Sequence, residues 1–322
     1  MKKKLTILGG LSASAALLWL AFRHADPRAL AAIFSGLRIA PLWLILFTVS
    51  GELAVRGLKW SLLLAPAGKV RALDAAKIET AGLALNNILP LRLGELARAA
   101  SGAQLFRISL VTVLATILAE KALDMAALLL LVFAAAGAGA LPGWLTGHRE
   151  IWTALAAAAV LTALLSGRLL ALARKFSVLG GTLEKLGLGL KALRSPAAAA
   201  AIFLLALLQW SLNSLNYYWL ALAFGSGGLV SLPQCAVLSF TGAAASSAPG
   251  MPGYFGGFEL AVSAVVSSWG LGRETALAYA LAAHLLPYLI TTAAGIFFIH
   301  RMGESLAGIW RQFSNGGGRK TL

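Results

Sequence analysis

Two hydrophobic stretches of the chain are broken in the middle: Asn86-Asn87-Ile88-Leu89-Pro90-Leu91-Arg92-Leu93-Gly94-Glu95 and Ala248-Pro249-Gly250-Met251-Pro252-Gly253-Tyr254-Phe255-Gly256-Gly257-Phe258-Glu259. A helix that faces lipid does not tolerate such a break, because hydrocarbon offers no hydrogen-bond partner to the freed backbone groups. Paired broken segments in two halves of a chain are typical of a transporter's binding site. The sequence therefore predicts a membrane transporter with a polar site inside the bilayer.

The composition places nearly the whole chain in a membrane. Of the 322 residues, 59% are hydrophobic and 12% are charged, whereas soluble domains carry about 25% charged residues. The net charge of +15 comes from Lys and Arg between hydrophobic segments, as expected of cytoplasmic loops, so we exclude nucleic-acid binding. Cys235 is the single cysteine, which excludes an intramolecular disulfide and a thiolate metal cluster. We expect one integral membrane domain, residues 1–322.

The hydrophobic pattern predicts an all-α, polytopic bundle with about six full spans and two re-entrant hairpins. The spans are Leu5–Phe22, Pro41–Ala65, Ser109–Leu141, Ile151–Ser166, Pro196–Phe224 and Thr275–His300. The hairpins are Asp74–Phe106 and Pro233–Trp269, whose arms of about 15 residues are too short to cross a core of ~30 Å. Lys59, Lys69 and Arg71 mark a cytoplasmic exit, and residues 167–195 form a basic cytoplasmic loop. Both termini then lie in the cytoplasm.

The two hairpins predict an internal repeat, with residues 41–141 as the first copy and 196–300 as the second. Glu95 and Glu259 each end a hairpin motif and lie 164 positions apart. The same offset relates Glu120 to His284, and Glu52 to the polar Asn216. An inverted repeat would bring the two hairpins in from opposite faces, with their tips near the midplane.

Charged side chains inside spans are costly and normally face a partner or a cavity. Glu52 and Arg56 are four residues apart and lie on one helix face, either as a structural ion pair or as part of a phosphate site. Glu120 and Asp124 have the same spacing but like charge, so a cation must lie between them. Arg92, Arg98 or a cationic substrate group would supply it. Lys121 points away and is expected to extend to the headgroups.

The breaks carry further candidates for contact with a substrate. Asn86 and Asn87 either satisfy the backbone groups freed by Pro90 or present the hairpin tip to an anionic headgroup. Tyr254 offers a hydroxyl, and His284 is either a hydrogen-bonded core residue or a proton carrier. The predicted substrate-binding residues are Glu52, Arg56, Asn86, Asn87, Arg92, Glu95, Arg98, Glu120, Asp124, Tyr254, Glu259 and His284. The residues that break the helices are Pro90, Gly94, Pro249, Pro252, Gly253, Gly256 and Gly257. In the second break, Gly250, Gly253, Gly256 and Gly257 allow close backbone approach and positive φ.

The motifs also resemble a known family. They are Asn87-x-x-Pro90-x-Arg92-x-Gly94-Glu95-x-x-Arg98, Glu120-Lys121-x-x-Asp124 and Pro249-x-x-Pro252-Gly253-x-x-Gly256-Gly257-x-Glu259. Their order resembles the lysylphosphatidylglycerol synthase transmembrane-region family, and the resemblance implies a bundle that moves an amphiphilic lipid between leaflets. The aminoacyl-transferase half is absent, so lysine transfer is not carried over. Lys121 and His284 depart from the Arg and the basic residue that the family often has there.

We therefore expect a lipid translocase of the bacterial inner membrane that needs no cofactor or metal. Its cargo would be a phospholipid, an aminoacyl lipid or a polyprenyl or hopanoid-type lipid, with an anionic or aminoacylated headgroup. Enzyme motifs such as a phosphate-binding loop are absent from the sequence, and we expect no enzyme activity. Two alternatives stay open: a secondary transporter of a small solute, or a membrane subunit of a lipid- or glycan-modifying enzyme. A homo-oligomer is also open.

Overall fold

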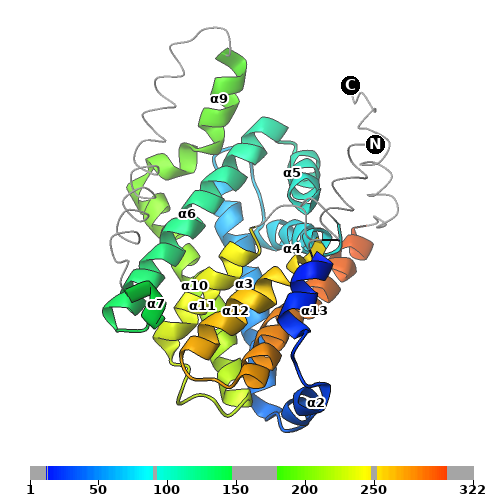
Figure 1. Ribbon diagram of the computed structural model, residues 1–322. Coiled ribbons are helices and arrows are strands. Elements are labelled where there is room, and N and C mark those ends of the chain that lie inside the picture. Colours follow the sequence, from blue (N-terminus) through cyan, green and yellow to red (C-terminus); the bar gives the residue numbers. More distant parts are fainter. Residues whose placement is uncertain (1–11, 13, 90–92, 147–179, 248–251, 303–322) are drawn as a thin grey trace.

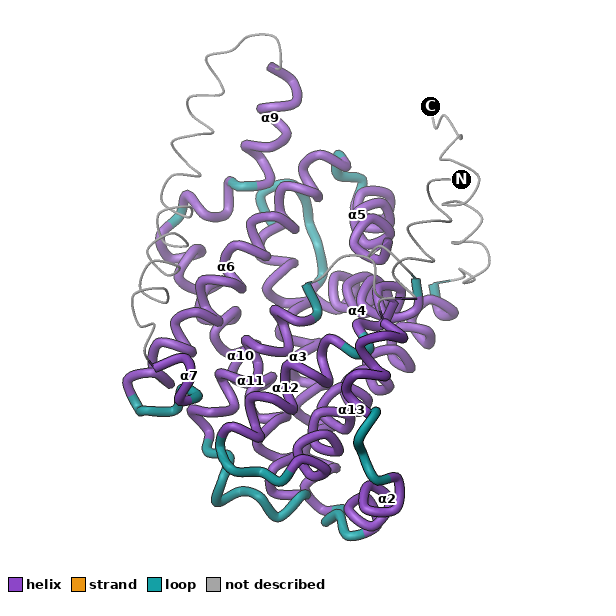
Figure 2. Tube along the Cα trace, viewed as in Figure 1, coloured by secondary structure: helices purple, strands orange, loops and turns teal. Residues whose placement is uncertain are grey.

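A computed structural model describes residues 12, 14–89, 93–146, 180–247 and 252–302 (Figure 1). Within these residues all regular secondary structure is helical (Figure 2). The elements are α2 (Pro27–Ser35), α3 (Ala40–Leu64), α4 (Ala72–Ile88), α5 (Leu93–Phe106), α6 (Leu110–Gly137), α7 (Gly143–Thr146), α9 (Gly180–Gly189), η3 (Lys191–Arg194), α10 (Pro196–Ala223), α11 (Leu232–Ala245), η4 (Pro252–Tyr254), α12 (Gly257–Ser268) and α13 (Arg273–Arg301). The predicted all-helical class is confirmed.

Three of the described helices are long and apolar enough to cross a membrane: α3, α10 and α13. They coincide with the second, fifth and last predicted spans. Helix α6 has 28 residues and lies within the predicted third span, but Glu120, Lys121 and Asp124 interrupt its apolar surface. The span Ile151–Ser166 lies outside the described residues, and Leu5–Phe22 is described only at residue 12 and over 14–22, which are helical. The count of six spans therefore stays a prediction.

Both predicted hairpins are pairs of short helices that pack against each other. Helices α4 and α5 have 17 and 14 residues, and α11 and α12 have 14 and 12. Residues 90–92 and 248–251, which include Pro90 and Pro249, lie outside the described chain. Pro252 begins the short helix η4. The sequence thus located both breaks to within a few residues.

The two halves pack in matching ways. Helix α4 of the first hairpin packs on α13, the last helix of the second half, and α11 of the second hairpin packs on α6. Between them, α3 packs extensively against α10. An internal repeat would produce such an exchange of partners, and both the repeat and its inverted relation stay predictions.

Glycine at the breaks serves two different purposes. A Cβ at Gly94 would lie 2.0 Å from the carbonyl oxygen of Gly82, so the arms of the first hairpin meet backbone to backbone. At the second break Gly253 and Gly256 have φ angles of 62° and 91°, a region that side chains rarely adopt. Gly257 then begins α12. The predicted positive φ is confirmed at Gly253 and Gly256, and the predicted close backbone approach at Gly256, where a Cβ would lie 2.7 Å from the backbone nitrogen of Leu18. Gly250 lies outside the described residues.

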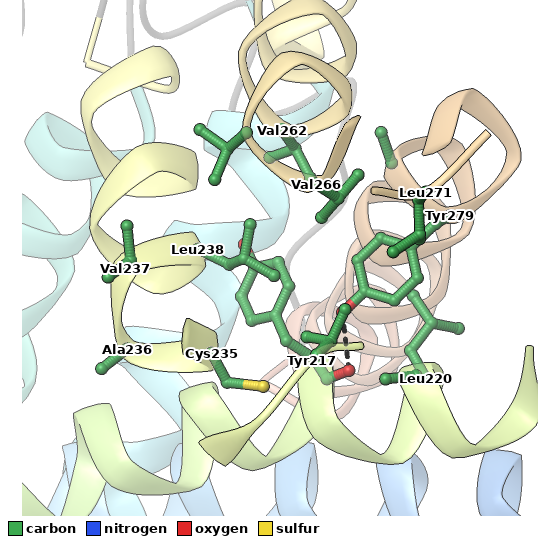
Figure 3. Close-up of a cluster of buried hydrophobic side chains, with 14 of the residues drawn as sticks. Tyr217, Leu220, Cys235, Ala236, Val237, Leu238, Val262, Val266, Leu271 and Tyr279 are labelled. Atoms are coloured by element: carbon green, nitrogen blue, oxygen red, sulfur yellow. Dashed lines mark hydrogen bonds between the residues drawn. The ribbon is translucent and has the colours of Figure 1, made fainter. Parts of the chain in front are cut away.

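An apolar cluster fills the second half of the molecule (Figure 3). Leu238 from α11, Val262 and Val266 from α12, and Tyr279 from α13 are all buried there. The hydroxyl of Tyr279 donates a 2.7 Å hydrogen bond to the carbonyl oxygen of Tyr217 on α10. Cys235 is buried in the same cluster. Dense apolar packing therefore joins the second hairpin to the long helices.

Candidate functional site

A cavity of about 400 Å³ lies between the two hairpins and the long helices α3, α6, α10 and α13. Its lining combines apolar side chains such as Val49 and Leu128 with many polar ones. The polar lining residues are Glu52, Arg56, Asn86, Asn87, Glu95, Lys121, Asp124, Asn213, Asn216, Ser239, Ser246, Ser247, Tyr254, His284, Tyr288 and Thr291. Residues that are more than 200 positions apart in the sequence thus face one internal space.

Glu52 and Arg56 form the ion pair that their spacing predicted. Nε and Nη2 of Arg56 both donate to Oε1 of Glu52, at 3.0 and 2.7 Å. The second oxygen of Glu52 accepts a 3.2 Å hydrogen bond from Asn213 on α10. Because one carboxylate holds both a cation on its own helix and an amide on the next, it fixes α3 against α10 at the cavity wall.

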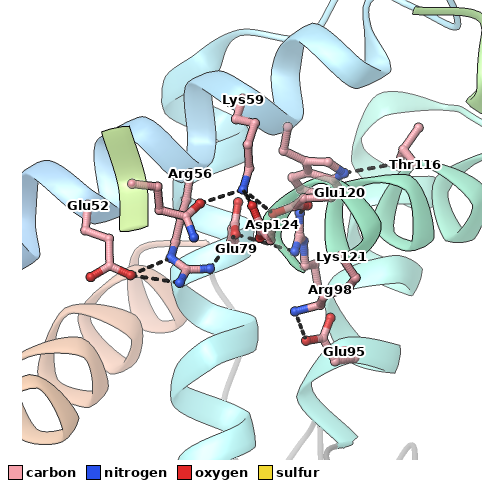
Figure 4. Close-up of polar contacts among 12 residues, drawn as sticks. Glu52, Arg56, Lys59, Glu79, Glu95, Arg98, Thr116, Glu120, Lys121 and Asp124 are labelled. Carbon is pink, nitrogen blue, oxygen red and sulfur yellow. Dashed lines mark hydrogen bonds and ion pairs between the residues drawn. The ribbon is translucent and has the colours of Figure 1, made fainter. Parts of the chain in front are cut away.

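Lys59 corrects the sequence prediction. It was expected to mark a cytoplasmic exit, but its side chain is fully buried, at 0% exposure. Its Nζ donates to Asp124 and, at 2.5 Å, to Oε1 of Gln209, and it lies 3.5 Å from Oε1 of Glu120 (Figure 4). Lys59 is thus the cation between the two like charges of α6, a place that the sequence assigned to arginine or to a substrate.

Arg98 is a second cation in this network, as expected. Its Nη2 donates to Oε2 of Glu120 at 2.5 Å, and its guanidinium lies over the ring of Trp60, 4.1 Å from the centroid. Glu79 on α4 lies between Arg98 and Arg56, with 3.5 and 3.8 Å from its Oε1 to the nearest Nη1 atoms. Neither oxygen of Glu79 accepts a hydrogen bond within the described chain, so Glu79 is held by charge alone.

Lys121 does not turn away from the network. Its Nζ lies 2.8 Å from Oε1 of Glu95 on α5, with 47% of the lysine side chain exposed. This pair closes the polar row that Figure 4 shows between α3, α4, α5 and α6. Arg92, the other cation expected here, lies outside the described residues.

The second hairpin contributes one carboxylate–imidazole pair. Oε1 of Glu259 lies 2.6 Å from Nδ1 of His284 on α13, and Oε2 accepts a 2.6 Å hydrogen bond from the backbone N–H of Gly256. The imidazole is stacked on Phe258, with ring centroids 4.5 Å apart. Glu259 therefore joins the break, its own helix and α13, while His284 faces the cavity.

The tip of the first hairpin is tied to α13. Nδ2 of Asn87 donates to the hydroxyl of Thr292 at 2.8 Å, and the hydroxyl of Tyr288 donates to the carbonyl oxygen of Asn87 at 3.1 Å. Within the described residues, the side-chain amide of Asn87 thus bonds to the other half of the molecule. Both halves meet at the cavity through this contact.

The structure brings most of the predicted substrate-binding residues together. Glu52, Arg56, Asn86, Asn87, Glu95, Asp124, Tyr254 and His284 line the cavity. Arg98, Glu120 and Glu259 lie behind this lining in ion pairs or hydrogen bonds. The structure thus shows that these residues lie together around the cavity. That they bind a substrate stays a prediction.

Three buried polar residues were missed or undervalued by the sequence reasoning: Lys59, Glu79 and Gln209. A signal for two of them exists in the helical period. Lys59 follows Glu52 by seven residues and Arg56 by three, and Gln209 precedes Asn213 by four residues and Asn216 by seven. Residues at i, i+4 and i+7 share one helix face, so each triplet predicts a polar stripe directed at the interior. Among the described residues no group of His, Cys, Asp or Glu could hold a metal ion.

Comparison with known protein families identifies the family of this chain. The family model described as "Lysylphosphatidylglycerol synthase TM region" matches residues 7–295, which is most of the chain and includes every described residue that lines the cavity. A search of the curated proteins finds no match. With its apolar helices, the match indicates a membrane protein with a function related to membrane lipids. The chain belongs to the lysylphosphatidylglycerol synthase transmembrane-region family.

Proposed function

We propose that the protein is a lipid translocase of the bacterial inner membrane, with both termini in the cytoplasm. A lipid headgroup occupies the cavity between the two hairpins while its hydrocarbon chains stay in the bilayer. The headgroup crosses between leaflets as the cavity opens first to one side and then to the other. Membrane lipids are therefore both its surroundings and its substrate.

The observation that carries this proposal is the convergence of polar side chains from both hairpins on one cavity. Polar groups at membrane depth are costly and usually mark a pathway for a substrate or an ion. A volume of about 400 Å³ falls in the range of small-molecule pockets and would admit a headgroup. Apolar lining residues, such as Met125 and Leu286, would accept the first part of the glycerol or prenyl chain.

The packing of the halves supports alternating access. Each hairpin packs on the last long helix of the other half, so a rocking motion of one half would move both hairpin tips relative to the cavity. Secondary transporters with internal repeats change access by this kind of rigid-body motion around a fixed site. No nucleotide is required for such a cycle.

The test is transport in vesicles. Purified protein is reconstituted into vesicles that contain a fluorescent lipid, and the fraction of label accessible to an impermeant quencher is followed over time. Ala243 lines the cavity, whereas its neighbour Ala244 on α11 is exposed. We expect Ala243→Trp to fill the cavity and lower the rate at least about tenfold, while Ala244→Trp leaves it unchanged.

Two results would refute the proposal. One is a rate no higher than that of protein-free vesicles for every lipid tried, with folded protein present. The other is equal transport by the Ala243→Trp and Ala244→Trp variants, because the pathway would then not run through the cavity.

A further inference from the structure

Among the ion pairs of the described chain, the one between Glu259 and His284 is set apart by its chemistry. The others join a carboxylate to a lysine or an arginine, and both of these cations ordinarily keep their charge at physiological pH. Imidazole ordinarily gains and loses its charge between about pH 5 and 8. The net charge of this pair therefore depends on whether it holds a proton.

Loss of that proton would leave a net charge in the interior. One oxygen of Glu259 accepts a 2.6 Å hydrogen bond from the backbone N–H of Gly256, and the other lies 2.6 Å from Nδ1 of His284. When both ring nitrogens carry a proton, the imidazolium balances the carboxylate. When the ring has lost one, no cation of the described chain remains in an ion pair with Glu259, and an unpaired buried charge is costly. Binding and release of a proton thus change the buried charge by one unit.

The pair is reached from the cavity through its imidazole. His284 lines the cavity and its side chain is 7% exposed, whereas that of Glu259 is 0% exposed. The rings of Phe255 and Phe258 lie against the imidazole, with centroids 4.8 and 4.5 Å from its own. A proton therefore enters and leaves through the side of the imidazole that meets the cavity.

The charged groups on the neighbouring helices are paired with one another or lie far away. Helices α12 and α13 pack among α2, α3, α4, α10 and α11. The charged side chains of α2, α3 and α4 are Arg28, Glu52, Arg56, Lys59, Asp74, Lys77 and Glu79. Arg28 is exposed, and the other six are held in ion pairs with each other or with α5 and α6. The other charged or titratable side chains at the ends of α13 are Arg273, Glu274, His300 and Arg301. They lie ten or more residues from His284, which is about 15 Å along a helix.

The other titratable groups nearby are phenols and a thiol, which ordinarily carry no charge near pH 7. They are Tyr217 and Tyr218 on α10, Cys235 on α11, Tyr254 on η4, and Tyr279 and Tyr288 on α13. The remaining charged residues that line the cavity, Glu95, Lys121 and Asp124, are in ion pairs. His284 is thus the cavity-lining side chain of the described chain whose type ordinarily titrates near neutral pH.

The pair also lies where the two halves of the molecule meet. Glu259 belongs to α12 of the second hairpin. His284 belongs to α13, which holds Asn87 at the tip of the first hairpin through Thr292 and Tyr288. Alternating access around a fixed site moves one half against the other, so it must move at least one hairpin relative to α13. The same motion that changes the access of a headgroup therefore changes the access of the pair.

We propose that the translocase is coupled to protons and that Glu259 and His284 form its proton-binding site. This inference rests on the proposed translocase function and adds the ion that drives it. In each cycle a proton from water on one side of the membrane forms an N–H bond with a ring nitrogen of His284. The same bond breaks when the proton is released to water on the other side. Glu259 is a positioning residue that holds the ring and balances its charge.

The experiment asks whether a pH difference distributes a lipid unevenly between leaflets. Vesicles with the purified protein contain fluorescent phosphatidylglycerol or fluorescent phosphatidylethanolamine, and potassium with valinomycin holds the membrane potential at zero. An impermeant quencher measures the final fraction of label in the outer leaflet, with and without a pH difference. Coupling of one proton to one lipid would give a ratio between leaflets of up to about tenfold for each pH unit. We expect the pH difference to change the ratio at least about twofold for at least one of the two lipids.

A matched pair of variants on α13 assigns the coupling to the site. His284→Gln keeps a side chain that can donate a hydrogen bond to Glu259 but cannot change its charge. Lipid should then distribute evenly whatever the pH difference. His300 is exposed near the end of α13, and His300→Gln should respond to the pH difference as the wild type does.

A second measurement needs no variant. Wild-type vesicles enclose a pH-sensitive dye, and unlabelled phosphatidylglycerol or phosphatidylethanolamine is added to the outer leaflet. We expect the internal pH to change while the lipid that responds to the pH difference crosses, and to stay constant in protein-free vesicles. This measurement decides the coupling even if His284→Gln does not fold.

The outcomes separate the inference from the function on which it rests. If lipid crosses but its final distribution and the internal pH ignore each other, coupling is overturned and the translocase stands. If folded His284→Gln responds to the pH difference as His300→Gln does, the site is wrong. If neither lipid crosses with folded wild-type protein present, the translocase function and its coupling are both overturned.

Discussion

The two hairpins are built alike but are anchored by different physics. The first hairpin is fixed by a buried row of charges: its Arg98 and Glu79 face each other, Arg98 contacts Glu120 on α6, and Lys59 on α3 contacts Asp124 on α6 beside them. The second is fixed by apolar packing around Leu238, to which the described chain adds one close carboxylate–imidazole contact, between Glu259 and His284. The same architecture is therefore stabilised by directional contacts on one side and by non-directional burial on the other.

This difference indicates a division of labour at the cavity. A buried charge that loses its partner is strongly destabilising. Each buried pair therefore keeps its two side chains, and the helices that carry them, in one relative position. Together, such pairs hold the α3, α4, α5 and α6 wall in one arrangement. Apolar surfaces tolerate changes of side chain that conserve volume, so the wall made by α11 and α12 depends on shape and not on individual partners.

The largest effect is expected for Lys59→Met. Its removal leaves Glu120 and Asp124 as neighbouring buried carboxylates without their shared cation. Breaking a buried ion pair by loss of one partner costs about 3–5 kcal/mol of unfolding free energy. Thermal or denaturant unfolding in detergent measures it. Lys69→Met is the control, since Lys69 is exposed and its loss should change stability by less than about 0.5 kcal/mol.

The double variant Lys59→Met/Asp124→Asn shows whether charge is the cause. Without Lys59, Arg98 still holds Glu120, and Asp124 is the carboxylate that has lost its cation. Neutralising Asp124 should therefore restore part of the stability lost in Lys59→Met. If the double variant is as unstable as the sum of the two single ones, the cost is one of packing, and the contrast between the hairpins disappears.

A somewhat smaller loss is expected for Leu238→Ala in the second half. Leu238 is fully buried in the apolar cluster, and truncation of such a side chain costs about 2–5 kcal/mol through lost burial and the cavity left behind. Leu238→Met keeps the volume and should cost less than about 1.5 kcal/mol. Equal losses in the unfolding of the Ala and Met variants would show that shape is not what holds this wall.

Arg98→Lys probes the directional contacts of the first hairpin. Lysine keeps the charge but lacks the planar group that bonds Glu120 and stacks on Trp60. We expect a loss of about 1–2 kcal/mol, the value of a desolvated cation–π contact with a weakened ion pair. Arg38→Lys, at an exposed position, serves as the control. Equal unfolding midpoints for both variants would mean that charge alone is sufficient at position 98.

The helical class and the two helix breaks were predictable from the sequence, because a proline or a run of glycines stands out within a hydrophobic segment. Pro90 and the glycines from Gly253 to Gly257 interrupt hydrophobic runs in which a polar residue is itself costly. The pairing of Glu52 with Arg56 was also predictable, since four residues on a helix bring side chains onto one face. Contacts between residues four apart on one helix do not depend on how the helices pack against each other.

Contacts between helices were less predictable. Lys59 was misread because a lysine near the end of a hydrophobic run normally lies at the headgroups, and its burial depends on Asp124 and Gln209 from two other helices. The burial of Glu79 could not be predicted from its own helix, because the two arginines that surround it lie on α3 and α5. The periodic stripes on α3 and α10 would have identified Lys59 and Gln209, but not the pairing between them.

The smallest loss of stability is expected for Asp74→Asn, because this carboxylate pairs with an arginine and a lysine at the surface and not in the interior. Asp74 accepts hydrogen bonds from Arg71 at 2.7 Å and Lys77 at 3.2 Å, and the Arg71 side chain is 83% exposed. Partial burial raises the pKa of Asp74, but the hydrogen bonds and charges of Arg71 and Lys77 outweigh it, so the pKa lies below its ordinary value. Solvent screening limits such pairs to about 0–1 kcal/mol.

The sign of the pH dependence separates this surface contribution from the buried one. A carboxyl group with a lowered pKa in the folded state stabilises the protein above its unfolded-state pKa, about 3.9, and loses that contribution as the pH falls through the folded-state value. Wild type and Asp74→Asn should therefore differ by less than about 1 kcal/mol at pH 7 and converge below about pH 4. Unfolding curves across this range measure it. A loss at pH 7 as large as that of Lys59→Met would mean that charge, and not its burial, sets the strength of the first hairpin's contacts.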